Sequence, residues 1–194
     1  SNTKVYTVRA DFDKKTSTAT SYSFGAKYAN SSINSDSYYR INDNGQWRDD
    51  DSRSNRYRYH EEVWAGYGKM NTKFWGNQIT IGLRVEGTSL SSYSLTMERE
   101  DRQSYVDFFP SVSLMRQFGK EKAHSIALNY SRRISRPYYG IFNPYEIPLS
   151  EFSAVVGNPD IRPSYINRYS VTGVFFQKYS VTAEYGHYTG LISQ

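Results

Sequence analysis

The residue types that most often carry out chemistry are scarce in this chain and poorly spaced for it. The three histidines, His60, His124 and His187, lie far apart and show neither the H-x-H nor the H-E-x-x-H spacing of zinc sites. There is no cysteine, so no thiolate ligand, Cys nucleophile or disulfide is available. No G-x-S-x-G, phosphate-loop or dinucleotide fingerprint occurs either. We therefore predict that the chain is not an enzyme and holds no metal ion or cofactor.

Two charged stretches have the composition of weak binding sites. The run Asp49-Asp50-Asp51, with Asp43 and Asn44 nearby, loosely resembles an oxygen-rich cation site, but a solvated loop is the simpler interpretation. Basic and aromatic residues alternate over residues 53–59, as in some surfaces that bind nucleic acid. The net charge is only +5, however, and acidic residues accompany the basic ones throughout. We predict no nucleic-acid partner.

A third set of charged residues consists of arginines that flank a proline-rich stretch. Guanidinium groups in such a place could hold an anion or a glycan, or they could pair with carboxylates and so pin a loop. The second interpretation is favoured. The arginines are Arg132, Arg133, Arg136 and Arg162, and the candidate carboxylates are Glu86, Glu146, Glu151 and Asp160.

Strands must position these residues, because the hydrophobic pattern has a period of two along most of the chain. No run of ~18 apolar residues occurs, which excludes a transmembrane helix but not a transmembrane barrel. The chain is therefore predicted to be all-β, with about eight antiparallel strands. The expected strands are residues 6–12, 22–28, 57–67, 78–86, 106–118, 124–132, 169–176 and 180–188.

The connections between these strands alternate between tight and long. The tight turns are expected at 13–16, 70–73, 119–122 and 177–179, and the long loops at 30–54, 89–104 and 134–167. Such an alternation is typical of an up-and-down meander with short turns at one end, which is the plan of outer-membrane barrels. We therefore expect a curved sheet or partial barrel from a larger transmembrane β-barrel.

The alternation also predicts which residues share a face. Ile79, Ile81, Leu83 and Val85 should lie with the apolar residues of 22–28 and 126–130 on a face that meets lipid, and Arg84 and Glu86 on the opposite face. Aromatic residues surround an aliphatic centre in some strands, as Tyr57, Tyr59 and Tyr67 surround Val63 and Ala65. They could form interfacial aromatic girdles, or they could reflect only the preference of Tyr for strands.

Five motifs follow one another between residues 78 and 170. They are GLRVEGT at 82–88, FFPS at 108–111, YSRRISRP at 130–137, FNPY at 142–145 and GNPDIRP at 157–163. In this order they resemble the outer-membrane β-barrel domain of TonB-dependent receptors, in particular the barrel family abundant in Bacteroidetes.

The resemblance implies a bacterial outer-membrane location and a role in the import of a scarce nutrient such as a siderophore, cobalamin or a glycan. Members of the family are barrels of ~22 strands with an N-terminal plug domain in the lumen, and they receive energy from TonB. This chain contains no plug sequence. We therefore expect residues 1–194 to be a single fragment from inside the barrel domain, not competent for transport alone. Its expected partners are outer-membrane lipid or detergent, TonB only through the absent plug, and other copies through exposed strand edges.

In such a receptor the long loops would face outside and bind ligand, and the tight turns would face the periplasm. Aromatic and basic loop residues suit this role, because sugars and chelates are held by stacking and by charge-assisted hydrogen bonds; alternatively, the same residues only pack the loops. A soluble all-β carbohydrate-binding module, with Trp47, Trp64 and Trp75 stacking on sugars, and a passive outer-membrane porin are the other functions considered. The predicted ligand-binding residues are Tyr38, Tyr39, Trp47, Arg99, Tyr138, Tyr139 and Tyr145.

Overall fold

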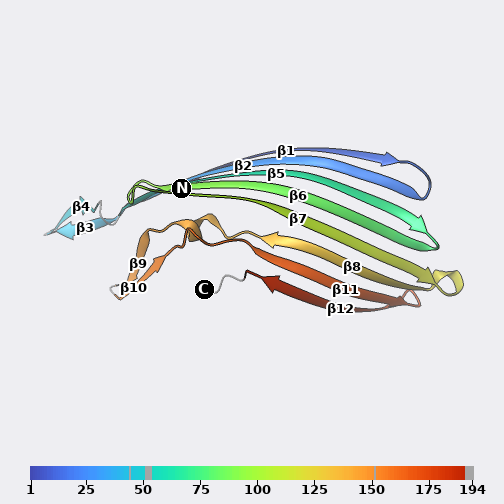
Figure 1. Cartoon of the computed structure of the whole chain (residues 1–194). Helices are drawn as coiled ribbons and strands as arrows, with labels where there is room; N and C mark the ends of the chain where they lie inside the picture. Colours follow the sequence, from blue (N-terminus) through green and yellow to red (C-terminus); the bar gives the residue numbers. More distant parts are fainter. Residues whose placement is uncertain (44, 51–53, 151, 191–194) are drawn as a thin grey trace.

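The computed structural model describes residues 1–43, 45–50, 54–150 and 152–190, and within them it is almost entirely β. Eight long strands form one antiparallel sheet in which each strand pairs with the next long strand along the chain (Figure 1). The predicted meander is therefore confirmed. In sheet order the strands are β1 (Asn2–Lys15), β2 (Thr20–Ser37), β5 (Asn55–Phe74), β6 (Asn77–Ser94), β7 (Arg99–Phe118), β8 (His124–Ser135), β11 (Ser164–Phe175) and β12 (Tyr179–Thr189).

The sheet is curved and open. The strands β1 and β12 each pair with one neighbour, so both edges of the sheet carry unpaired backbone groups within the described chain (Figure 1). Two small hairpins lie outside the sheet, in connections at the same end of it: β3 (Arg40–Asp43) with β4 (Gln46–Asp49), and β9 (Glu146–Ser150) with β10 (Ser153–Val156).

The connections at the two ends of the sheet differ in length, although not as regularly as predicted. At one end all four are short: 16–19, 75–76, 119–123 and 176–178, the third containing the 3₁₀ turn η2 (Lys120–Lys122). At the other end 38–54 and 136–163 are long, and the second contains the 3₁₀ turn η3 (Tyr139–Phe142). Residues 95–98 between β6 and β7 form a short turn there.

The predicted loop boundaries therefore need correction. Most of 89–104 is strand, because β6 and β7 stay paired from Ser89 opposite Ser104 up to Ser94 opposite Arg99. Residues 30–37, also predicted as loop, belong to β2 and pair with β5 as far as Ser37 opposite Asn55. Both stretches are rich in Ser and lack apolar alternation, so the hydrophobic pattern alone does not predict them as strands.

The register confirms the predicted faces over most of the sheet. Directly opposed residues in an antiparallel pair point to the same side. Phe24 lies opposite Gly68, Gly68 opposite Leu83, and Leu83 opposite Pro110, which defines an apolar face. Val112, Tyr130 and Tyr169 continue this face across β7, β8 and β11. It is not covered by the chain itself, since Leu83 is 48% exposed and Leu128 45% exposed.

Two groups of aromatic side chains lie on the apolar face. The rings of Tyr28 and Trp64 lie 4.2 Å apart, and Tyr169 lies 4.9 Å from Tyr130 and 6.2 Å from Tyr185, measured between ring centroids. The Tyr28–Trp64 pair lies in the row next to Asn30 and Glu62, which favours an interfacial position for these two rings.

The opposite, polar face also matches the prediction. Ser21, Asn71, Thr80, Ser113 and Asn129 form one continuous row across five strands. Arg84 and Leu83 point to opposite sides, as expected from the strand period.

The polarity of the two faces is reversed where β2, β5, β6 and β7 continue past Tyr28 and Trp64. We call this part of the sheet the extension; it comprises residues 30–37, 55–62, 88–94 and 99–105. There the apolar face becomes mostly polar, with Asn30, Glu62, Ser89 and Ser104 in one row. The polar face becomes apolar and carries the buried residues Ile33, Tyr57, Tyr59 and Leu90.

This reversal corrects one sequence-based assignment. A lipid-facing girdle formed by Tyr57, Tyr59 and Tyr67 around Val63 and Ala65 was one of two interpretations of these residues. All five lie on the polar side of the sheet, because Ala65 is opposite Lys27 and Glu86, and Tyr67 is opposite Gly25 and Arg84. Trp64, the residue between them, is the aromatic side chain on the apolar face.

Candidate functional site

The most elaborate structure on the polar face is the connection between β8 and β11, residues 136–163, which folds back over the extension. Prolines 137, 144, 148, 159 and 163 prevent this segment from joining the sheet as a strand. It closes on itself through backbone bonds, from Gly157 N–H to Asn143 O at 3.0 Å and from Asn158 N–H to Ile141 O at 2.7 Å. A Cβ on Gly157 would collide with the backbone at Ile141 and Asn143, so this crossing requires glycine.

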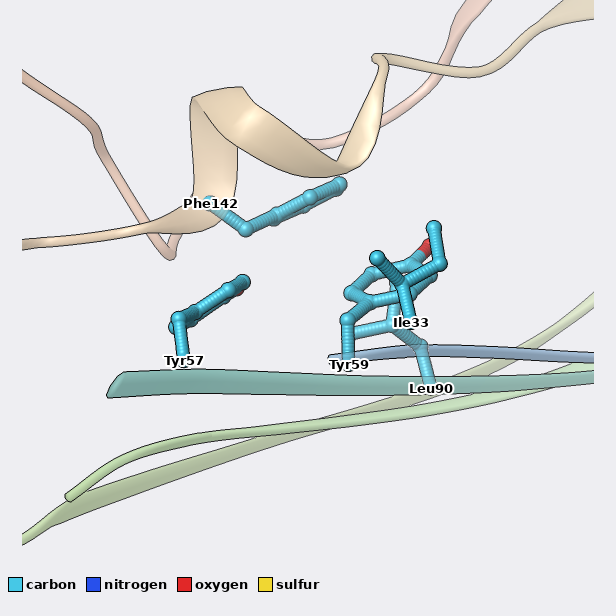
Figure 2. Packing of buried hydrophobic residues seen from close by; sticks show 5 residues of the cluster. All are labelled: Ile33, Tyr57, Tyr59, Leu90 and Phe142. Carbon is cyan, nitrogen blue, oxygen red and sulfur yellow. The ribbon is translucent and has the colours of Figure 1, made fainter. Parts of the chain in front are cut away.

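A small hydrophobic core attaches this loop to the sheet. Phe142, in η3, is 3% exposed and points down onto side chains of β2, β5 and β6 (Figure 2). Its ring centroid lies 5.9 Å from that of Tyr59, and Tyr139 lies 6.2 Å from Tyr59. The members of this cluster are Ile33, Tyr57, Tyr59, Leu90 and Phe142, with Tyr139 and Ile161 packed against it. The loop is therefore part of the wall and not a free surface loop.

Polar contacts fix the same loop at two further places. The Gln103 amide donates to the carbonyl of Pro159 at 2.6 Å, and the Asn55 amide donates to Asn143 Oδ1 at 3.0 Å. Both partners come from the extension, so the loop is held from β5 and from β7.

The strongest attachment is ionic and involves Arg136, the first residue after β8. Its guanidinium donates to Glu86 Oε2 at 2.6 Å and to Thr88 Oγ1 at 3.2 Å, and its Nε lies 3.5 Å from Glu61 Oε1. Burial alone would lower the pKa of Arg136, but the hydrogen bond and the charge of Glu86 outweigh it and raise the pKa above its ordinary value. One of the predicted arginine–carboxylate pairs is thereby confirmed. Of the other proposed carboxylates, Glu151 lies outside the described residues.

Glu86 connects this attachment to a row of polar side chains that crosses the sheet. Arg84 also pairs with Glu86, and its guanidinium lies 5.2 Å from the ring centroid of Tyr67. The hydroxyl of Tyr67 donates to Asp11 Oδ1 at 2.5 Å, and Asp11 pairs with Arg9 at 2.6 Å. The contacts thus run without interruption from β1 through β5 and β6 to the loop. We call these residues the transverse network: Arg9, Asp11, Tyr67, Arg84, Glu86 and Arg136.

The network needs a gap in β2, which Gly25 provides. The Tyr67 ring lies across this position so closely that a Cβ on Gly25 would collide with it. The sequence predicted that Arg84 and Glu86 lie on the polar face but not that they belong to a network, since only the register brings Asp11 of β1 close to Tyr67 of β5.

The seven predicted ligand-binding residues occupy different environments. Tyr38 is 66% exposed, Trp47 on β4 is 69% exposed, and Tyr138 is 65% exposed. By contrast, Tyr139 packs against the loop core, and the Tyr145 N–H donates to Asn143 Oδ1 at 3.2 Å. Tyr39 takes part in the backbone contacts that close the 38–54 connection, and Arg99 pairs with Asp101 at 2.9 Å. Tyr38, Trp47 and Tyr138 are therefore the most exposed of the seven, although the Arg56 guanidinium lies 6.0 Å from the Tyr38 ring centroid and the Tyr139 ring centroid 5.9 Å from that of Tyr138.

The described residues contain no cluster of three or more metal-ligating side chains. They also contain no helix long and apolar enough to cross a membrane. Asp51 of the acidic run lies outside the described residues, so the loose cation-site interpretation is not tested by the structure.

Comparison with known proteins identifies the family to which the chain belongs. The sequence profile described as "Outer membrane protein beta-barrel family" matches residues 1–194. The chain belongs to this family. The protein therefore lies in the bacterial outer membrane. In such a barrel we expect the apolar face to meet lipid and the polar face to line the lumen. No curated protein matches the chain by sequence.

Solved structures with the same fold are transporters and import receptors by their descriptions. The copper transporter OprC superposes with a TM-score of 0.71 at 11% identity, over 95% of this chain and 29% of that chain. The ferric-catecholate import receptor Fiu from E. coli K12 superposes with a TM-score of 0.61 at 10% identity, over 88% of this chain and 28% of that chain. The ferric yersiniabactin uptake receptor FyuA from Yersinia pestis superposes with a TM-score of 0.55 at 11% identity, over 96% of this chain and 28% of that chain. The chain thus spans less than a third of the length of these structures and has the fold of part of a TonB-dependent receptor barrel.

Proposed function

We propose that the protein is a TonB-dependent receptor that imports a scarce nutrient, and that this chain supplies part of its barrel wall and ligand-facing loops. The observation that best supports this proposal is the docked loop 136–163. A hydrophobic core, polar contacts and a partly buried ion pair hold it against the polar side of the sheet. A loop held in this way can present Tyr138 in a fixed position at the mouth of the barrel, which lowers the entropic cost of ligand binding.

The arrangement of the two ends of the sheet also supports the proposal. The extension and both hairpins lie at the end where Tyr38, Trp47 and Tyr138 are exposed. Exposed aromatic rings bind sugars and aromatic chelates by stacking. We infer that this end faces outside the cell and that a siderophore, cobalamin or a glycan is the cargo.

Uptake measurements test the proposal. Cells that carry the gene, cells that lack it and cells that lack functional TonB are compared for uptake of a labelled ferric catecholate, labelled cyanocobalamin and a labelled oligosaccharide. The expected result is that one probe enters only when both the gene and TonB are present. Uptake that needs the gene but not TonB would identify a passive porin instead, and no gene-dependent uptake of any probe would contradict the proposal.

Substitutions then test the role of the exposed aromatic residues. Trp47→Ala and Tyr138→Ala should each weaken binding of the transported probe by about tenfold, because a stacked ring contributes on the order of 1 kcal/mol or more. Trp75→Ala is the matched control, since Trp75 is 84% exposed in a tight turn at the opposite end. Equal losses for all three variants would mean that the loops do not form the binding site.

A further inference from the structure

A shallow hollow of about 260 Å³ on the luminal wall is unusually rich in positive charge. Its lining residues come from β1, β2, β5, β6 and β7. Four of them are cationic, and within the described residues none is a carboxylate: Arg9, Lys27, Lys69 and Arg84.

The charges of these four side chains are compensated unequally. Arg9 pairs with Asp11 outside the hollow, and Arg84 pairs with Glu86, which Arg136 also shares. No ion pair joins Lys27 or Lys69 to a carboxylate of the described residues; Lys27 is half-buried and Lys69 is exposed. The hollow therefore carries two uncompensated ammonium groups beside guanidiniums that are already neutralised.

Two residues, Gly82 in the floor and Tyr67 at one side, keep the hollow unfilled. Gly82 lies in the floor, where a Cβ would come within 2.7 Å of Ser111 Oγ, and this hydroxyl makes only a long hydrogen bond of 3.5 Å, to the Gly82 carbonyl. The Tyr67 ring stands as a wall, held by its hydrogen bond to Asp11 and flanked by the guanidiniums of Arg9 and Arg84 at 5.6 and 5.2 Å. These contacts keep the Tyr67 ring from moving into the hollow.

These features suit an anionic group. A carboxylate in the hollow would meet two ammonium groups and a hydroxyl, all of which are donors to oxygen. The enclosing barrel would strengthen the attraction, because a cavity of one sign of charge with low-dielectric walls focuses the field. We propose that this luminal hollow binds carboxylates, supplied either by a small polycarboxylate solute or by acidic side chains of a protein segment inside the lumen. The proposal needs only the barrel fold and not TonB dependence.

The solute source is tested by calorimetric titration of the whole barrel protein in detergent with citrate. Binding should weaken at least tenfold in the Lys27→Gln/Lys69→Gln double variant, and sucrose, which is neutral, should not bind. Lys120→Gln/Lys122→Gln is the control, because these lysines lie in the 119–123 turn, away from the hollow. The control should bind citrate as the wild type does.

The internal source is tested in the same protein by charge reversal. If acidic side chains of the protein already occupy the hollow, citrate will not bind, and Lys27→Glu/Lys69→Glu will make a segment inside the lumen sensitive to trypsin while the Lys120→Glu/Lys122→Glu control stays protected. Either result supports a carboxylate site and identifies its source. Absence of citrate binding together with unchanged protection in the reversed variant would overturn the proposal.

Discussion

Arg136 is one of several attachments that hold the 136–163 loop to the wall, so its removal should loosen the loop without unfolding the barrel. Arg136→Ala leaves Glu86 paired with Arg84 but removes the hydrogen bonds to Glu86 and Thr88. A charge-assisted hydrogen bond contributes about 1.5–3 kcal/mol, which predicts a large rise in cleavage of the loop by added protease. Arg162→Ala serves as the control, because Arg162 is an exposed arginine of the same loop. The anchor assignment is wrong if both variants are cleaved at the same rate.

Gly25 provides a second test at the scale of single residues. Gly25→Ala places a methyl group against the Tyr67 ring and should displace it from Asp11, at a cost of about 1–3 kcal/mol in stability. Gly66→Ala is the matched control, since a Cβ there meets no atom within 4 Å. The measurement is the temperature at which the barrel loses its compact migration in detergent electrophoresis. If the two variants melt together, Tyr67 is not held as described.

Individual residues of the site were only partly predictable from the sequence. The pairing of an arginine after β8 with Glu86 was among the predicted alternatives, because charges flanking a proline-rich loop usually pair. The packing of Phe142 on Tyr59 and the contact between Tyr67 and Asp11 were not predicted. Both contacts depend on which strands become neighbours and in which register, and hydrophobic pattern alone does not supply that register.

At the scale of single strands, the two faces of β8 should respond oppositely to the same charge. Leu128 lies on the lipid-facing side, and Asn129, its neighbour, faces the lumen and contacts Ser113 at 2.7 Å. Leu128→Arg should cost about 2–4 kcal/mol, because a guanidinium at the depth of the hydrocarbon is destabilising. Asn129→Arg should cost far less. Reversible unfolding in urea with lipid vesicles measures the difference, and an equal cost for both would refute the face assignment.

Strand type and strand faces could be predicted because alternation is strong where one face meets lipid, as in 78–86. The same reasoning failed in the extension for a physical reason. Beyond the membrane boundary, the face that meets lipid elsewhere is in contact with water. Tyr57 and Tyr59 therefore lie on the inner face there, and Ser89 and Ser91 lie on the outer face. A rule that assigns apolar residues to lipid therefore gives the wrong side there, and a serine-rich stretch such as 89–94 is taken for a loop.

For the whole molecule, the proposed orientation makes opposite ends of the sheet accessible from opposite sides of the membrane. The 194 residues contain no cysteine, so a single introduced thiol is unique within the chain. Trp47→Cys should react with a membrane-impermeant maleimide on intact cells, because Trp47 is 69% exposed among the long connections. Lys178→Cys, in the 176–178 turn, should react only after the outer membrane is permeabilised. The reverse pattern would invert the orientation.

The exchange of polarity between Trp64 and Glu62 also determines how deep the barrel sits in the bilayer. Moving the barrel inward by one row would bring Glu62, with its partners Tyr28 and Asn30, into hydrocarbon, and the next row would bring His60. Moving it outward would lift Trp64 and Tyr28 away from the interface into water. Adjacent rows of the same strands thus define the boundary of the hydrophobic band at this end, and the lipid must adjust locally to meet it. The loops at this end of the barrel therefore lie at a fixed height above the lipid surface, whichever ligand they bind.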